Sequence, residues 1–165
     1  MKIRVLNIND AELMLEWMHD DSVVRNLKSD FKSKTLDDCK QFIIDANTLQ
    51  DQVHLAIVDD DDIYMGTVSL KNIRNHTAEF AITVRSCAMG KGYSKFGMTE
   101  IIKKAFTEYQ LNEVYWCVDP QNIRAVRFYD KNGYSKCSAP LNVTGYSNFE
   151  LEYFLWYSVQ NTRYL

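Results

Sequence analysis

Two glycines one residue apart stand in the segment Met89-Gly90-Lys91-Gly92-Tyr93-Ser94, between a strand pattern and a helix pattern. Residues 77–85 alternate as a strand does, and residues 95–109 carry apolar side chains at helical spacing. At such a junction, backbone N–H groups and the positive end of the helix dipole favour a bound anion. The segment therefore predicts a phosphate site, although paired glycines also occur in plain turns. It lacks the P-loop and dinucleotide-binding patterns.

A second motif lies one helix and one strand further along the chain. It has the form N-x-x-[A/S]-x-x-x-Y-x-K-x-G-[F/Y], and the matching residues are Asn122, Ala125, Tyr129, Lys131, Gly133 and Tyr134. Together with a glycine segment of the form [Q/R]-x-x-G-x-[G/A], this motif resembles the GNAT (GCN5-related N-acetyltransferase) superfamily. The resemblance implies an enzyme that transfers an acetyl group from acetyl-CoA to a primary amine, with the CoA pyrophosphate bound at the glycine segment.

The resemblance also implies a fold of the α/β (α+β) class. Its central sheet is mixed and mostly antiparallel, with about seven strands flanked by about four helices. The pattern of this chain agrees, with strands predicted at 3–6, 53–58, 63–70, 77–85, 114–118, 134–138 and 149–157. Helices are predicted after caps at Asn9 and Thr35, over 95–109, and from Asn122 to 132. We expect residues 1–165 to form one acetyltransferase domain.

The expected cofactor site combines the end of one strand, the glycine segment and the second motif. Its residues are Ile82, Thr83, Val84, Met89, Gly90, Lys91, Gly92, Tyr93, Ser94, Asn122 and Lys131. The first three imply backbone N–H groups for the acetyl carbonyl and its oxyanion. Two residues depart from the family pattern, because Met89 replaces glutamine or arginine and Ser94 replaces glycine or alanine. Support for the pyrophosphate is therefore expected from Lys91 or Lys95.

The family's reaction is direct transfer, in which the amine attacks the thioester carbonyl and CoA leaves as a thiolate. Tyr129 matches the family's proton donor to that thiolate. Glu79 is the leading candidate for the base that deprotonates the amine, because it lies on the strand that ends at the glycine segment. The alternative interpretation is that Glu79 is a carboxylate at the edge of the sheet and pairs with Arg85.

Three further residues carry weaker chemical hypotheses. His54 and His76 are possible bases, but a lone histidine at a strand end is more often a surface residue. Cys117 raises the rival mechanism of an acyl-cysteine intermediate. Its neighbours Trp116 and Val118 favour instead a buried, inert thiol.

The acceptor is expected between the first helices and the late strands, as the resemblance implies. Residues 17–25 resemble a W-x-x-D-x-x-V-R signature found in amino-sugar and ribosomal-protein N-terminal acetyltransferases, which points to Trp17, His19, Arg25 and Phe31 as substrate-binding residues. Trp17 can stack on a sugar or belong to the core. An amino sugar is the first expectation, a protein N-terminus the second, and an antibiotic or polyamine the third. The alternative from another functional class is a non-catalytic module that binds acyl-CoA.

Composition limits the expected binding partners and the expected cellular location of the protein. A net charge of −3 leaves no basic excess for nucleic acid, and no apolar run is long enough for a membrane span. The four cysteines form no C-x-x-C pair, which favours reduced thiols and predicts neither a disulfide framework nor a metal site. We therefore expect a cytoplasmic protein, and the resemblance implies acetyl-CoA as its cofactor. A homodimer is compatible with the resemblance.

Overall fold

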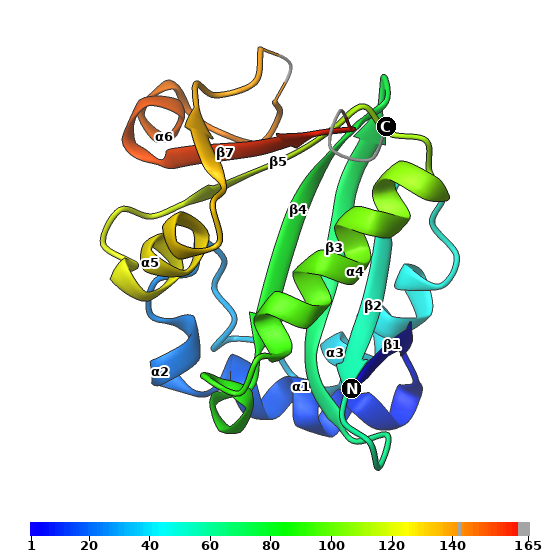
Figure 1. Ribbon diagram of the computed structural model, residues 1–165. Coiled ribbons are helices and arrows are strands. Elements are labelled where there is room, and N and C mark those ends of the chain that lie inside the picture. Colours follow the sequence, from blue (N-terminus) through cyan, green and yellow to red (C-terminus); the bar gives the residue numbers. More distant parts are fainter. Residues whose placement is uncertain (142, 162–165) are drawn as a thin grey trace.

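The computed structural model describes residues 1–141 and 143–161, and its centre is a seven-stranded sheet with the order β1-β2-β3-β4-β5-β7-β6 (Figure 1). All neighbouring strands are antiparallel except β4 and β5. The strands are β1 (Lys2–Val5), β2 (Val53–Val58), β3 (Tyr64–Arg74), β4 (Thr77–Val84), β5 (Glu113–Val118), β6 (Ser135–Cys137) and β7 (Leu155–Gln160). The predicted mixed, mostly antiparallel sheet is confirmed.

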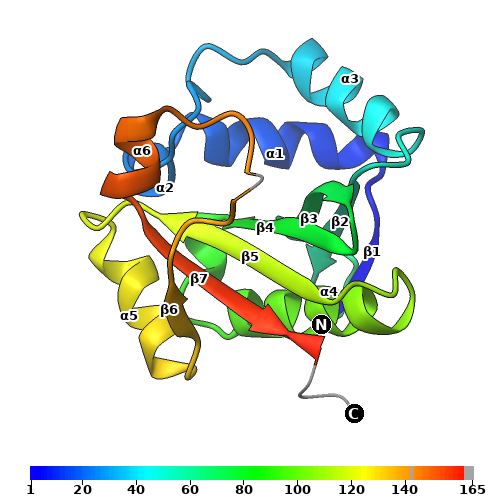
Figure 2. The same cartoon turned by 90° about the horizontal axis from the view of Figure 1, so that it is seen from above.

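Helices cover both faces of the sheet (Figure 2). One face carries α1 (Ala11–Met18), α2 (Asp21–Val24), α3 (Leu36–Ala46) and α6 (Asn148–Tyr153), and the other carries α4 (Tyr93–Thr107) and α5 (Ile123–Lys131). The described part of the chain thus has six α-helices where about four were expected, because the short helices α2 and α6 were not predicted. None of the described helices is long and apolar enough to span a bilayer.

Capping residues explain where most helices begin. Thr35 and Asp38 form the predicted capping box of α3. The predicted cap at Asn9 is wrong, because Asn7 accepts from the Asn9 amide and makes the capping box with Asp10. The strand predicted over 149–157 is wrong in its first half. Ser147 and Glu150 form a capping box there, so the chain makes α6 before β7 begins at Leu155.

The parallel strands β4 and β5 diverge along their length. They pair only where Thr77–Glu79 faces Glu113–Tyr115, whereas on its other side β5 pairs with β7 along its whole length. The last residues of β4 therefore have β3 on one side and no strand on the other. This gap in the sheet lies next to the glycine segment, because η2 (Ser86–Ala88) and residues 89–92 directly follow β4.

Two apolar clusters, one on each face, hold the sheet between the helices. The cluster under α4 contains Phe80, Val84 and Trp116, and the cluster under α1 and α3 contains Met14 and Ile43. The predicted alternation of β4 is confirmed, because its even-numbered residues Ala78, Phe80 and Val84 belong to the α4 cluster. Its odd-numbered residues accordingly face α1 and α3.

Candidate active site

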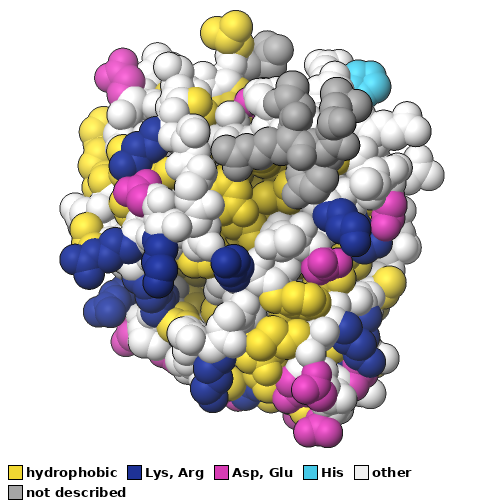
Figure 3. Space-filling model, viewed as in Figure 1, with side chains coloured by type: hydrophobic (Ala, Val, Ile, Leu, Met, Phe, Trp, Pro, Cys, Tyr) yellow, Lys and Arg dark blue, Asp and Glu magenta, His cyan; other side chains and the backbone are white. Residues whose placement is uncertain are grey.

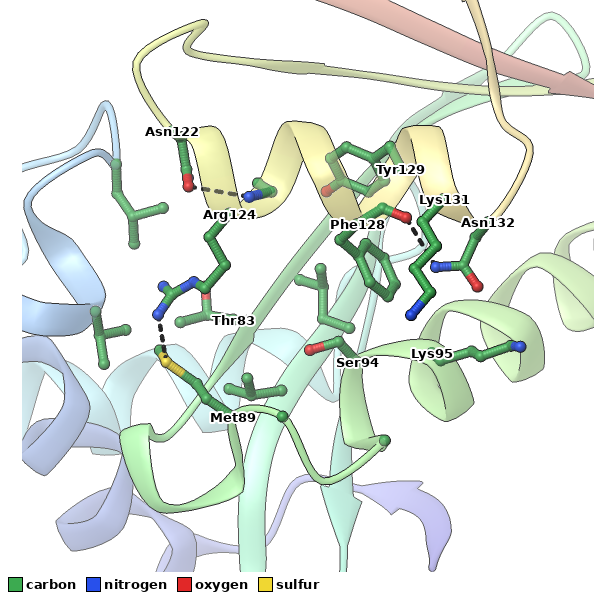
Figure 4. Close-up of a pocket in the computed structure, with 17 residues that line it drawn as sticks. Thr83, Met89, Ser94, Lys95, Asn122, Arg124, Phe128, Tyr129, Lys131 and Asn132 are labelled. Carbon is green, nitrogen blue, oxygen red and sulfur yellow. Dashed lines mark hydrogen bonds between the residues drawn. The ribbon is translucent and has the colours of Figure 1, made fainter.

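A cleft of about 520 Å³ opens at the gap between β4 and β5 (Figure 4). Its walls come from the end of β4, the glycine segment, the start of α4 and one side of α5. The expected cofactor residues among its lining are Ile82, Thr83, Val84, Met89, Gly90, Gly92, Ser94, Asn122 and Lys131. Lys91, which is exposed, and Tyr93, which is half-buried, do not line it.

The N-terminus of α4 presents free backbone donors to this cleft. Gly92 is the N-cap residue and has φ of 90°, a left-handed conformation that favours glycine. The first hydrogen bond of the helix runs from the Phe96 amide to the Gly92 carbonyl, so the preceding amides of α4 have no helical acceptor. No acidic side chain stands in the first turn, and Gly92 provides no side-chain cap. The arrangement suits a phosphate group.

Two backbone amides of β4 also face the gap. Arg85 N donates to Met65 O of β3 at 2.9 Å, which fixes the direction of the alternating amides along this strand. The amides of Ile82 and Val84 consequently point away from β3, toward the place that β5 has left. Within the described residues neither amide has a hydrogen-bond acceptor. The Thr83 amide, by contrast, faces β3, so only two of the three expected residues present an N–H group to the cleft.

An arginine of α5 lies beside Met89, the position at which the family pattern has glutamine or arginine. Arg124 reaches across the cleft and donates from Nη1 to the Met89 sulfur at 2.6 Å (Figure 4). Lys95 and Lys131 also line the cleft. Lysine and arginine side chains gather on this side of the molecule, over the region of α5 (Figure 3). The sequence prediction named Lys95 and Lys131 but missed Arg124, although Arg124 lies two residues after the motif's Asn122.

Tyr129 lies on α5 with its ring packed against Trp116 and Tyr157. Its side chain lines the cleft, and among the described residues its hydroxyl has no hydrogen-bond partner. Burial raises the pKa of Tyr129, so the phenol keeps its proton. The Tyr129 hydroxyl is thus a free donor inside the cleft.

Asn122 is the cap residue of α5, the structural role that the sequence also allowed. Its side chain accepts a hydrogen bond from the Ala125 amide at 3.2 Å.

A second cavity of about 350 Å³ lies on the opposite face of β4, beneath α1 and α3. Ile82 and Thr83 line both cavities, so the two cavities adjoin at the end of β4. Trp17 and Phe31 line the second cavity and contact each other edge to face, with ring centroids 5.1 Å apart. A ligand in the cleft and a ligand in this cavity can therefore approach each other at β4.

The remaining predicted acceptor residues lie elsewhere. His19 is exposed at the end of α1, where its Nε2 lies 2.9 Å from the Lys34 carbonyl. Arg25 is exposed at the end of α2. Neither residue lines the two cavities.

Glu79 is buried in the middle of the sheet and does not line either cavity. Its carboxylate accepts from Tyr146 Oη at 2.8 Å, from Lys71 Nζ at 3.1 Å and from Asn72 Nδ2 at 3.2 Å. The alternative of an edge carboxylate paired with Arg85 is wrong, because β4 is an inner strand and Arg85 binds Glu16 instead.

The histidine and cysteine hypotheses have different outcomes. His76 is exposed, as expected, but His54 is buried and lines the second cavity. Burial, with a contribution from Lys71, lowers the pKa of His54 to about 4. Cys117 lies outside both cavities, and burial raises the pKa of its thiol to about 11. A thiol that stays protonated is a poor nucleophile, which supports the inert interpretation of Cys117.

The site thus has the features of one class of protein, in which a gap in the sheet offers free amides to a phosphate group at the start of α4 and free amides to an oxyanion at the end of β4. Residues 1–135 match the family model described as an acetyltransferase (GNAT) domain. The chain belongs to this family and is an acetyl-CoA-dependent N-acetyltransferase. No curated protein sequence matches it.

Solved structures with the same fold include spermidine N-acetyltransferases of Vibrio cholerae. The complex with CoA and spermine has a TM-score of 0.81 at 17% identity, over 99% of this chain and 96% of that chain. The F149A mutant has a TM-score of 0.77 at 19% identity, over 100% and 98%. A dodecameric structure in an intermediate state has a TM-score of 0.74 at 18% identity, over 99% and 95%. At these identities the likeness shows the shared fold.

Arg124→Gln is expected to raise the KM for acetyl-CoA about tenfold, because a charge-assisted hydrogen bond to phosphate is lost. Adding Met89→Arg should restore most of the affinity for acetyl-CoA, because the loop position at which the family has glutamine or arginine then supplies the positive charge. Initial rates over a range of acetyl-CoA concentrations measure both effects. Arg127→Gln is the matched control, because Arg127 is exposed on the same helix and does not line the cleft. Equal changes in KM for Arg124→Gln and Arg127→Gln would contradict the assignment.

Proposed function

We propose that this enzyme acetylates the primary amine of an amino sugar, free or linked to a nucleotide. The observation that carries the proposal is the composition of the second cavity. Its wall on the α1 and α3 side is aromatic, with Trp17, Phe31 and Phe42, and its floor on β3 carries Thr67, Ser69 and Lys71. Sugar rings have apolar faces and polar edges, so an aromatic wall opposite a polar strand fits them.

The charges around the second cavity argue against a polyamine acceptor. Its charged lining residues are Lys34, Lys71 and Asp38. The Asp38 carboxylate is engaged as part of the α3 cap, accepting from Thr35 N and Thr35 Oγ1 at 2.8 Å each. A polyamine with several positive charges would therefore meet Lys34, a Lys71 that is paired with Glu79, and a carboxylate that is already committed to Thr35, so the described lining offers it no free acidic partner.

The proposed reaction takes place where the cavities meet. The amine in the second cavity attacks the thioester carbonyl of acetyl-CoA held in the cleft, so a C–N bond forms and the C–S bond breaks. The amides of Ile82 and Val84 stabilise the oxyanion, and Tyr129 gives its proton to the departing thiolate. The cleft fits the cofactor because free amides at the start of α4 and the side chains of Lys95, Arg124 and Lys131 can hold its phosphates.

Glu79 stays our proposal for the base, with Lys71 standing between its carboxylate and the second cavity. A proton path through Lys71 is the arrangement that the contacts allow. Glu79→Gln should then lower the rate of acetyl transfer. An unchanged rate with an unchanged pH profile would show that another group accepts the proton.

An acceptor panel tests the proposal. CoA release from acetyl-CoA is measured with UDP-linked and free amino sugars, N-terminal peptides and polyamines, and we expect the largest kcat/KM for an amino sugar. A preference for polyamines or peptides would contradict the sugar assignment. Thermal stabilisation by acetyl-CoA without turnover on any amine would instead indicate the non-catalytic module. Light scattering on the same sample tests the expected homodimer. All assays use residues 1–165, which we propose to form a single domain.

A further inference from the structure

Two hydroxyl groups on β3 face the second cavity and are held by separate chains of hydrogen bonds. Thr67 and Ser69 are two residues apart, so their side chains lie on the same face of the strand, about 7 Å from each other. Both residues are buried, and both line the cavity. The mechanism proposed above uses neither of them. Their hydrogen-bond partners decide which one can donate to a ligand.

The first chain leaves the hydroxyl hydrogen of Thr67 free. Trp17 Nε1 can only donate, and it donates to Tyr64 Oη at 3.0 Å. Tyr64 Oη lies 2.7 Å from Thr67 Oγ1, and the Tyr64 side chain is buried. If Thr67 donated to Tyr64, the Tyr64 hydrogen would have no acceptor among the described residues, which is costly in a buried site. Tyr64 therefore donates to Thr67, which leaves the Thr67 hydroxyl hydrogen available to a ligand in the cavity.

The second chain leaves the lone pairs of Ser69 free. Gln52 Oε1 can only accept, and His54 Nε2 lies 2.9 Å from it, so Nε2 carries the hydrogen of the ring. Nδ1 is then an acceptor at 2.7 Å from Ser69 Oγ. The pKa of about 4 keeps His54 neutral at physiological pH, and Phe42 packs edge to face on its ring. Ser69 must donate to His54, and it can only accept from a ligand.

We infer that Thr67 and Ser69 select the acceptor by opposite hydrogen-bond polarity, Thr67 donating to one hydroxyl of a sugar ring and Ser69 accepting from a neighbouring one. This inference rests on the proposed function and names the residues that give it specificity. A linear monoamine with an unsubstituted carbon chain offers no group to either residue. Such an amine would leave both buried hydroxyls without their ligand partners, which disfavours its binding.

Deoxyfluoro analogues test the polarity, because fluorine cannot donate a hydrogen bond. The parent compound is the amino sugar that turns over best. Replacing its hydroxyl that donates to Ser69 with fluorine should lower the kcat/KM of the wild-type enzyme about tenfold. The same analogue should cause no further loss in Ser69→Ala, whose own kcat/KM is already reduced. Thr67→Val should remain sensitive to this analogue. A merely structural role of Ser69 would leave the wild-type and Ser69→Ala enzymes equally sensitive to it.

A second measurement does not depend on the acceptor. Nitrogen NMR of the three histidines, with His54→Asn to assign the signal, should show His54 neutral with its hydrogen on Nε2. A hydrogen on Nδ1 would reverse the polarity of Ser69 and overturn the inference, even if amino sugars are good substrates. Absence of turnover with every amino sugar would overturn the proposed function, and the inference about sugar hydroxyls with it.

Discussion

Tyr129→Phe is expected to lower kcat by about 10²- to 10⁴-fold, the usual contribution of a general acid. The substitution removes one oxygen that lines the cleft and has no hydrogen-bond partner among the described residues. The aromatic packing against Trp116 and Tyr157 stays, so the free energy of unfolding and the KM for acetyl-CoA should change little. Steady-state kinetics and urea denaturation measure the two effects separately.

Tyr157→Phe is the matched control for this experiment. Tyr157 is buried beside Tyr129 but lies outside the cleft, and its hydroxyl donates to Asp130 at 2.9 Å. Its loss should lower stability by about 1 kcal/mol and leave kcat nearly unchanged. Because burial raises the pKa of Tyr129, no titration of this phenol should appear in the pH profile near neutrality. A fully active Tyr129→Phe enzyme would show that the thiolate is protonated by another group.

Gly66→Ala is expected to destabilise the protein by about 3 kcal/mol and to weaken acetyl-CoA binding as well. A Cβ atom at Gly66 of β3 would lie 2.4 Å from the Thr83 carbonyl oxygen and 2.9 Å from Val84 Cα. Both neighbours are backbone atoms, so the strain is relieved only if β4 moves. The same part of β4 carries the Ile82 and Val84 amides that face the cleft, and a shift there misplaces them.

Urea denaturation and the thermal shift caused by acetyl-CoA measure the two consequences. Gly145→Ala is the matched control, because Gly145 has φ of 83° but no atom within 4 Å of an added Cβ. That control reports the cost of a left-handed backbone without a collision, about 1 kcal/mol. If Gly66→Ala cost no more than Gly145→Ala, the close approach of β3 and β4 would not limit the geometry of the site.

Local chemistry explains the parts of the fold that were predicted correctly. The α3 cap depends on Thr35 and Asp38, which are three residues apart. The strand 53–58 and the start of α5 at Asn122 likewise depend on residues close in sequence. The error at 149–153 belongs to the same category, since the Ser147 and Glu150 capping pattern is visible in the sequence but the aromatic residues favoured a strand.

The surroundings of the buried polar side chains could not be predicted in this way. Glu79 looked like an accessible base, but Lys71, Asn72 and Tyr146 enclose its carboxylate. His54 looked like a surface residue, but α3 covers it through Phe42. In both cases the decisive partners come from other elements of the structure, and a strand pattern gives only the face on which a residue lies.

The glycine segment and the Asn122 to Tyr134 motif by themselves determined the family, the cofactor and the candidate proton donor, because these features require certain residue types at short, fixed spacing. Tertiary structure alone decided which groups meet. The divergence of β5 from β4 opens the cleft, the packing of α5 brings Arg124 to Met89, and α1 and α3 form the second cavity over β3. Such contacts join segments far apart in the chain, so they depend on the order of the strands and on the packing of helices across them.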